Sequence, residues 1–270
     1  MSRKNHNPSL ARKIARHLKN GESPESLIPL VKSITDSYYI SISYFNLASF
    51  GFNDSKQTSK SFTSGFSELA KISQSWRRIE LLGEISKILK RIADSSTKNK
   101  QYAQLLSSSF REKTSDTKDF LVKNCKNFPA SMLKEMLEKV AGLGEDQFLP
   151  SKAIIRTWIS KGNKGALLDS VLESNSNIKI KLLGYIHLQF NKGNLDMNPT
   201  PLELALKLDN LEEHLNYLVR VCSTPKDLES FSQLSLDSDT LLALAVRADR
   251  KGFTDYYEKI LSEVENTINS

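Results

Sequence analysis

The hydrophobic residues of the chain recur at helical spacing along almost its whole length. Near the N-terminus, in PSLARKIARHLKNG, apolar side chains stand every four residues at Leu10, Ile14 and Leu18. Pro8 suits the first turn of a helix, and Gly21 is of a type that commonly follows a helix end. The alternation of apolar and polar residues that marks half-buried strands does not occur in any convincing run. The pattern therefore predicts an all-α protein.

One segment, residues 38–52 (YYISISYFNLASFGF), is rich in aromatic and β-branched residues, which favour strands. Its length, and the spacing of Tyr44, Leu47 and Ala48, favour a helix instead. We therefore predict a buried helix in this segment, against the local strand propensity.

Short breaks, many of which contain Gly, Pro, Ser or Asn, separate the remaining helical segments. The helices predicted after residue 54 occupy residues 55–73, 75–93, 99–113, 116–127, 129–141, 150–161, 164–174, 177–191, 200–208, 210–222, 225–233, 238–250 and 253–268. Tight turns between short helices place consecutive helices side by side in opposite directions. We therefore expect antiparallel helical hairpins, packed either as a stack or as an irregular multi-helix domain.

Internal similarity favours the stack. IELLGEI, at residues 79–85, and IKLLGYI, at residues 180–186, share five of seven residues and lie 101 positions apart. Residues 38–52 also align with residues 76–90 at an offset of 38. An offset of 38 fits one two-helix unit, and an offset of 101 fits three units of about 34 residues.

On these residues the hairpins resemble degenerate members of the α-solenoid superfamily, in the range of HEAT-like and tetratricopeptide-like repeats. The resemblance extends from Asp36 to Leu261 and implies stacked helical hairpins. We divide the chain into a basic N-terminal helix (1–21), N-terminal helical repeats (22–128) and C-terminal helical repeats (129–270), within one expected continuous structural unit. An irregular multi-helix domain is the alternative fold.

Both similar stretches contain a glycine in the middle of a predicted helix. Gly83 and Gly184 fall on the arc away from the main apolar stripe of their helices. Because a mid-helix glycine costs about 0.5–1 kcal/mol relative to alanine, we expect a second helix to approach closely on that side. Trp76 and Leu188 are expected to turn toward the same side.

Composition narrows the class of protein. Hydrophobic residues make up 39% of the 270 residues and charged residues 26%, as in a globular protein. No apolar run approaches the ~18 residues of a transmembrane helix, and the basic N-terminus lacks the apolar core of a signal peptide. Cys125 and Cys222 are isolated in sequence and are expected to be free thiols in a reducing compartment, which favours a cytoplasmic location.

The net charge of +7 is unevenly distributed. Residues 1–20 hold six Lys or Arg and no acidic residue, and residues 71–126 hold thirteen Lys or Arg against six Asp or Glu. Residues 127–270 are mildly acidic. The surface is therefore expected to be polarised, with its positive charge in the N-terminal half.

The sequence contains no recognisable catalytic or metal-binding motif. Its four histidines are not at metal-ligand spacing, and no Cys/His cluster suits zinc. His187 lies on an apolar helix and is expected to be a hydrogen-bonded core residue. Glu212, Glu213 and His214 are sequence neighbours, which do not share a helix face, so we expect no carboxylate–imidazole pair. We expect no cofactor and favour a non-enzymatic function, with an enzyme or its accessory subunit as the third alternative.

Three groups of residues are candidates for contact with a partner. The first is on the N-terminal helix and consists of Arg12, Lys13 and Arg16, with no acidic residue among residues 1–20. Such a helix suits phosphates, an anionic membrane or an acidic protein. The alternative is the polar terminal cap of a helical stack.

The second group lies opposite the apolar arc of the predicted helix 75–93 and consists of Arg77, Lys87, Lys90 and Arg91. Glu80 and Glu84 stand at spacings that permit ion pairs with these residues. A solvated, salt-bridged face is therefore the alternative to a binding surface.

The third group accompanies the predicted helix 177–191 and consists of Lys179, Lys181, Tyr185 and Lys192. When IKLLGYI is aligned with IELLGEI, Lys181 and Tyr185 stand at the positions of Glu80 and Glu84. Three unopposed lysines beside an exposed aromatic side chain suit a nucleic-acid backbone with a stacked base, or an acidic peptide. A solubilising lysine strip is the alternative.

Taken together, these patterns favour a non-catalytic protein–protein interaction or scaffold module. It would present an extended helical-repeat surface to a partner protein with an acidic surface. The main alternative is an RNA- or DNA-binding helical-repeat protein that uses the same basic residues. The sequence does not determine the oligomeric state.

Overall fold

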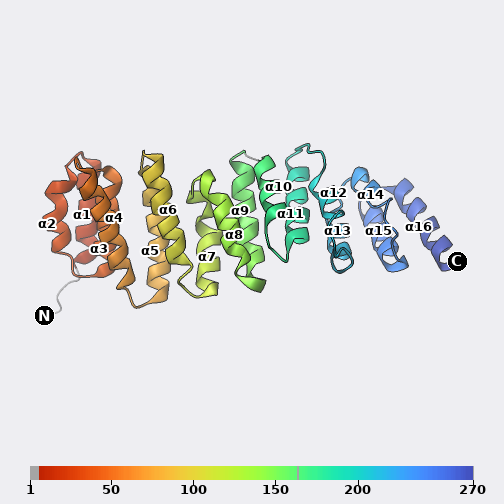
Figure 1. Ribbon diagram of the computed structural model, residues 1–270, viewed down its shortest axis with the longest axis horizontal. Helices are drawn as coiled ribbons and strands as arrows, with labels where there is room; N and C mark the ends of the chain where they lie inside the picture. Colours follow the sequence, from red (N-terminus) through yellow and green to blue (C-terminus); the bar gives the residue numbers. More distant parts are fainter. Residues whose placement is uncertain (1–5, 163, 270) are drawn as a thin grey trace. The chain divides into compact units, whose positions relative to one another are not determined.

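Helices make up the chain in the computed structural model, which describes residues 6–162 and 164–269 and holds no strand in those ranges (Figure 1). The predicted all-α, multi-helix class is therefore confirmed. Contacts between residues divide the chain into two units, Met1–Thr157 and Trp158–Ser270. The divisions predicted after residues 21 and 128 stay predictions.

The first unit contains most of the longer helices. It holds α1 (Asn7–Lys19), α2 (Pro24–Lys32), α3 (Ser37–Phe50), α4 (Ser55–Ala70), α5 (Ser75–Ile88), α6 (Ser95–Ser109), α7 (Thr114–Asn124), α8 (Leu133–Ala141) and most of α9 (Phe148–Ser160). Short 3-10 turns extend or join them at η1 (Leu89–Arg91), η2 (Cys125–Asn127), η3 (Ala130–Met132) and η4 (Gly144–Gln147).

The second unit contains several helices that are shorter than predicted. It holds α10 (Lys164–Glu173), α11 (Lys179–Lys192), α12 (Pro201–Ala205), η5 (Glu212–His214), α13 (Leu215–Val221), α14 (Pro225–Glu229), α15 (Ser238–Arg250) and α16 (Thr254–Asn269). The helix predicted at 200–208 ends at Ala205, and the one predicted at 210–222 is divided into η5 and α13. Between them Asn210 adopts a left-handed backbone with φ 65°. The helix predicted at 225–233 is reduced to the five residues of α14.

Side-chain caps explain where many helices begin. An oxygen of the residue before the helix accepts a hydrogen bond from a backbone N–H of the first turn at Ser23, Asp36, Asp54, Asp94 and Asp237. Reciprocal capping boxes start α12, with Thr200 and Glu203, and α14, with Thr224 and Asp227. Each cap satisfies N–H groups that have no partner inside the helix.

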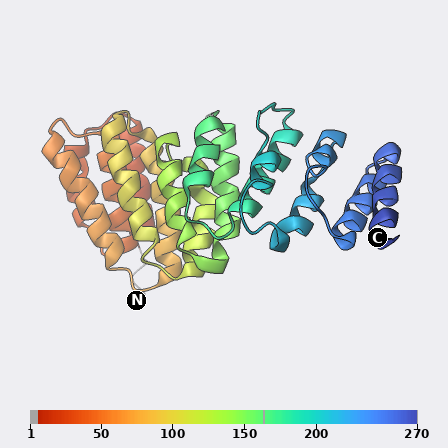
Figure 2. The ribbon, with the colours of Figure 1, turned by 45° about the vertical axis from the view of Figure 1, so that its right-hand side comes forward.

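In each unit, alternate helices form a row. α1 contacts α3, α3 contacts α5, and α5 contacts α7 in the first unit, while α11 contacts α13 and α13 contacts α15 in the second. The other helix of a hairpin lies beside its row partner, as α4 lies beside α3 and α16 beside α15 (Figures 1 and 2). Each inner row helix is thus packed on two sides by its row neighbours and on a third by a hairpin partner.

The segment with strand propensity is the buried helix α3, as predicted. Its Phe45 is fully buried and packs edge-on against Phe66 of α4, with ring centroids 4.8 Å apart. Ser41 donates a hydrogen bond to the carbonyl of Gly65, which brings the two helices close together. Contacts on several sides of α3 thus outweigh its local preference for a strand. Cys125 and Cys222 are buried, free thiols, as the sequence predicted.

The two mid-helix glycines face a neighbouring helix of their row, as predicted. A Cβ atom at Gly83 would lie 3.4 Å from Oδ1 of Asn124 in α7, which is an ordinary contact distance. At Gly184 a Cβ atom would lie 2.5 Å from Cε1 of Tyr217 in α13, which is too close. The hydroxyl of Tyr217 donates to the carbonyl of Lys181 at 3.0 Å and holds the ring against α11.

Trp76 does not turn toward the packed side. Its side chain is 67% exposed at the start of α5, so the expectation that it packs beside Gly83 is wrong. Trp76 stands in the first turn of α5, and it lines a groove on the surface of the first unit.

Alanine substitutions at the two glycines are predicted to have opposite effects. Gly184→Ala forces the Tyr217 ring to move, at about 1–3 kcal/mol for an overpacked contact. This cost exceeds the ~0.5–1 kcal/mol gained from helix propensity, so the midpoint of urea-induced unfolding should fall. Gly83→Ala is the matched control and should leave the midpoint unchanged or raise it.

The cause of the Gly184→Ala effect can be checked with a double variant. Gly184→Ala in a Tyr217→Ala background should no longer be destabilising, because the ring that meets the new methyl group is gone. Equal losses of stability in both backgrounds would contradict the role of Tyr217.

Candidate functional site

The basic residues predicted on α1 are available to solvent. Arg12, Lys13 and Arg16 are exposed, and none of them forms an ion pair within the described residues. His17, on the same helix, pairs with Glu22 in the following turn. The apolar stripe of α1, which includes Ile14 and Leu18, packs into the core of the first unit. α1 therefore presents an open cationic face while its apolar face anchors it.

Most of the basic residues predicted on α5 and η1 are already engaged. Arg77 donates two hydrogen bonds of 2.9 Å to Asp36, which caps α3, and Lys87 pairs with Glu84 at 2.6 Å. Lys90 is exposed. Arg91 donates to Oδ1 of Asn46 at 3.1 Å. The ion-paired interpretation of this face is therefore the better one, although the partner of Arg77 comes from another helix.

The strip predicted on α11 is not present as predicted. Tyr185 is only 7% exposed, so its description as an exposed aromatic residue is wrong. The buried positions of α11 extend around most of its circumference, because α10, α12 and α13 all pack against it. Nζ of Lys179 donates to the carbonyl of Leu172 at 2.7 Å. Lys181 is half-buried and Lys192 is exposed at the end of the helix.

A groove of about 420 Å³ runs between α1, α3 and α5 in the first unit. Its floor is α3, and its lining residues are Pro8, Ala11, Arg12, Ala15, Tyr38, Tyr39, Ile42, Asn46, Trp76, Arg77, Glu80 and Glu84. The α1 wall has small side chains except for Arg12, and the α5 wall begins with the exposed Trp76. The groove is thus lined by one predicted basic residue from α1, Arg12, and by one from α5, Arg77.

The α1 wall of this groove is basic, whereas the α5 wall carries two carboxylates together with Arg77. Arg12 stands on the α1 wall, and Glu80 and Glu84 stand on the α5 wall. Burial, with a further contribution from these two carboxylates, raises the pKa of Tyr38 to about 12. The guanidinium of Arg77 lies 5.4 Å from the centroid of the Tyr38 ring and covers it. Tyr38 therefore stays neutral at physiological pH.

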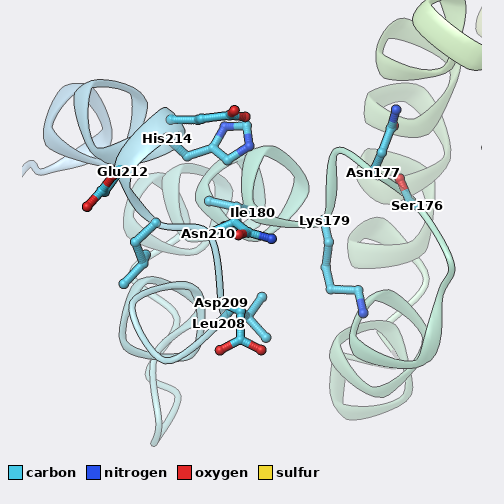
Figure 3. Close-up of a pocket in the computed structure, with 11 residues that line it drawn as sticks. Ser176, Asn177, Lys179, Ile180, Leu208, Asp209, Asn210, Glu212 and His214 are labelled. Atoms are coloured by element: carbon cyan, nitrogen blue, oxygen red, sulfur yellow. The ribbon is translucent and has the colours of Figure 1, made fainter.

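A larger cavity of about 950 Å³ lies in the second unit, between the turn before α11 and the turn before α13 (Figure 3). It contains Asp209, Glu212, Glu213 and His214, and Lys179 lies on its opposite side. In Figure 3 the side chains of Asp209, Glu212 and His214 do not converge on one point. The cavity is therefore large, but these three titratable side chains do not meet in it.

A buried polar cluster links α11 to the start of α14. His187 is 2% exposed, and its Nε2 lies 3.0 Å from Oδ1 of Asp227. The second oxygen of Asp227 accepts from the backbone N–H groups of Ser223, at 2.6 Å, and Thr224, at 2.9 Å. Asn191 donates to the hydroxyl of Ser223 at 2.7 Å. The prediction that His187 is a hydrogen-bonded core residue is confirmed.

Sequence reasoning missed the partners in this cluster. Asp227 stands three residues after Thr224, the spacing of a capping box, and that signal could have placed it at a helix start. Its pairing with His187, 40 residues away, has no signal in the sequence.

The cluster has the residue types of a hydrolase triad without its geometry. In such a triad the serine hydroxyl bonds to the histidine, and the carboxylate bonds to the other ring nitrogen. Here Ser223 bonds to Asn191 and Asp227, and Nδ1 of His187 is buried without a partner among the described residues. The cluster therefore holds two helices together and does not activate a nucleophile.

The described residues offer no metal centre and no membrane-spanning helix. Over residues 6–162 and 164–269, no three His, Cys, Asp or Glu side chains are grouped so that they could hold a metal ion. Within the same ranges, every helix is too short or too polar to cross a membrane. Burial raises the pKa of the Cys222 thiol, which keeps it protonated and unreactive at neutral pH.

Comparisons with protein-family models, with curated proteins and with solved structures found no match to the chain.

The Asp227 cluster predicts a specific loss of stability in acid. Burial by itself raises the pKa of Asp227, but hydrogen bonds from His187 and from the backbone of Ser223 and Thr224 outweigh burial and lower the pKa. A lowered folded-state pKa contributes stability above the ordinary value near 3.9, and this contribution disappears as the pH falls through the folded-state pKa. Asp227→Asn should destabilise the protein by about 2–3 kcal/mol at pH 7.

Urea unfolding at pH 7 and at pH 3 measures this effect. The difference in stability between wild type and Asp227→Asn should shrink at pH 3, where protonation removes the advantage of the carboxylate. Asp169→Asn, on the exposed face of α10, is the matched control. A constant difference at both pH values would contradict the assignment.

Proposed function

We propose that this protein is a non-catalytic protein-binding module and that a segment of a partner protein lies in the groove between α1, α3 and α5. The exposed Trp76 in this groove is the observation that carries the proposal.

We further propose that the rows of helices are degenerate α-solenoid repeats of the HEAT-like or tetratricopeptide-like kind. The protein is proposed to act in the cytoplasm, because its two cysteines are not joined in a disulfide.

Trp76 has the properties of an interface anchor. A tryptophan side chain contributes a large contact area and loses few rotatable bonds when it is immobilised. Tryptophan is also enriched among the residues that dominate binding energy. Trp76 stands beside a floor that includes Tyr39 and Ile42, so an apolar side chain of a partner can be desolvated on two sides.

The charges of the groove define the chemistry of the partner. Arg12 and the neighbouring Lys13 and Arg16 favour acidic side chains over the α1 wall. Glu80 and Glu84 repel acidic side chains from the α5 wall. The partner segment is therefore proposed to place an apolar or aromatic residue against Trp76 and its acidic residues toward α1.

Protein is favoured over nucleic acid as the ligand. Arg77, Lys87 and Arg91 bond to side chains of this chain, so Lys90 and Lys192 are the exposed cations that stay unengaged among the described residues of the two internal patches. Tyr185 is buried and does not offer the stacking platform that a single strand requires. The two carboxylates of the groove also oppose phosphates. Binding of RNA or DNA is the alternative, and the experiment below includes it as an outcome.

The test is selection of a random displayed peptide library on the full chain. Enriched peptides should combine an apolar or aromatic residue with acidic residues. Fluorescence anisotropy of one such labelled peptide should show a loss of about 2 kcal/mol, roughly 30-fold in Kd, for Trp76→Ala. Arg12→Glu should weaken binding and reduce its dependence on salt.

Two matched variants control for non-specific effects. Leu149→Ala removes an equally exposed apolar side chain from α9, and Lys126→Glu reverses an exposed charge outside the groove. Both should bind the peptide as the wild type does. No enrichment, or equal binding by Trp76→Ala, would contradict the proposal. Binding of a random-sequence RNA with a steep salt dependence, lost in Arg12→Glu, would support the nucleic-acid alternative instead.

A further inference from the structure

A second exposed face lies on α15 in the other unit. Leu242 is 49% exposed and Val246 is 42% exposed, although both belong to a helix whose opposite side is already buried against its neighbours. Their spacing of four residues places them one above the other on one face of the helix. α15 therefore has a second apolar stripe that the described residues leave about half exposed.

This stripe lines a groove of about 380 Å³ between α13 and α15, which contact each other along the row (Figure 1). α13 contributes Asn216, Val219 and Arg220, and α15 contributes Asp239, Leu242, Ala243, Val246, Arg247 and Arg250. The small side chain of Ala243 leaves room between the two apolar residues and the α13 wall. The surface is thus concave and apolar in its centre.

The charges around the stripe are mostly positive. Three arginines, Arg220, Arg247 and Arg250, line the groove against one acidic residue, Asp239. Arg247 donates through Nε to the carbonyl of Cys222 at 2.8 Å and is held in place. Arg220 and Arg250 are exposed and form no ion pair within the described residues. This basic groove lies in the half of the chain whose overall charge is acidic, so it is a local feature.

From this combination we infer that the groove between α13 and α15 binds an amphipathic helix of a partner protein, with aliphatic side chains on Leu242 and Val246 and carboxylates on Arg220 and Arg250. Helices recognised in this way present apolar side chains at intervals of three and four residues, which matches the spacing of Leu242 and Val246. The apolar centre disfavours phosphates, and the concave shape disfavours a flat lipid surface.

The site is independent of the groove that contains Trp76. It lies in the other unit and shares no residue with that groove. If peptide binding is absent at one groove, the proposal for the other groove can therefore still be tested. A variant of Trp76 should not change binding at α13 and α15.

The experiment uses two labelled 18-residue helical peptides with the same leucine stripe, one with glutamate and one with lysine at the polar positions. Anisotropy titrations with the full chain in low salt should give a Kd for the glutamate peptide at least about tenfold below that for the lysine peptide. The preference should decrease as salt screens the arginines.

Surface variants locate the binding. Leu242→Ser with Val246→Ser should weaken binding of the glutamate peptide by about tenfold or more, and Arg220→Glu with Arg250→Glu should reverse the preference between peptides. Ile268→Ser, at an exposed apolar position of α16, should bind as the wild type does. Circular dichroism and the unfolding midpoint verify that every variant is folded.

Any one of four results would overturn the inference. The first is equal binding of both peptides, and the second is binding that the double serine variant leaves intact. The third is a concentration-dependent increase in molar mass that this variant abolishes, which would make the face an interface between copies of this chain. Binding to anionic vesicles but to neither peptide would also overturn it, in favour of a lipid surface.

Discussion

The side chains of Asn124 and Tyr217 lie against glycines of the preceding helix in their rows, and these contacts limit how closely neighbouring helices approach. At Gly184 the fit is tight enough to exclude even a methyl group, while Gly83 leaves ordinary contact distance. A mid-helix glycine weakens an isolated helix. Here the neighbouring side chain offsets that weakness, so the stability of these helices comes from packing between hairpins more than from the helices themselves.

Packing in rows also determines which faces stay exposed. α3 is packed by α1, α2, α4 and α5, and α15 by α13, α14 and α16, and one face of each helix stays partly open to solvent. On α3 that face carries Tyr38, Tyr39 and Ile42, and on α15 it carries Leu242 and Val246. Tyr39 and Ile42 also pack against the core of the first unit, whereas Leu242 and Val246 are largely exposed. All of them line grooves that charged residues border, and this position is the basis on which we propose that they contact other molecules.

Helical periodicity was sufficient to predict the all-α class and most helices, because apolar spacing reflects which face is buried. It failed for the ends of some helices, such as α12, which stops at Ala205. It also failed for Tyr185, because a helix that is packed on several sides buries positions outside its main apolar stripe. It failed for Trp76, because the side chain of a first-turn residue can extend beyond the neighbouring helices. Pairs such as Arg77 with Asp36 and His187 with Asp227 join different helices, so no spacing within one helix could reveal them.

The fluorescence of Trp76 tests the central claim, that the groove between α1, α3 and α5 is a binding surface. The chain has two tryptophans, and Trp158 is buried, so Trp158→Phe leaves the exposed Trp76 as the sole indole reporter. Emission from this variant should be that of a water-exposed indole, readily quenched by acrylamide. Saturation with a peptide selected on the full chain should shift the emission to the blue and reduce the quenching. An unchanged spectrum and unchanged quenching at saturation would show that the peptide binds elsewhere and would contradict the account.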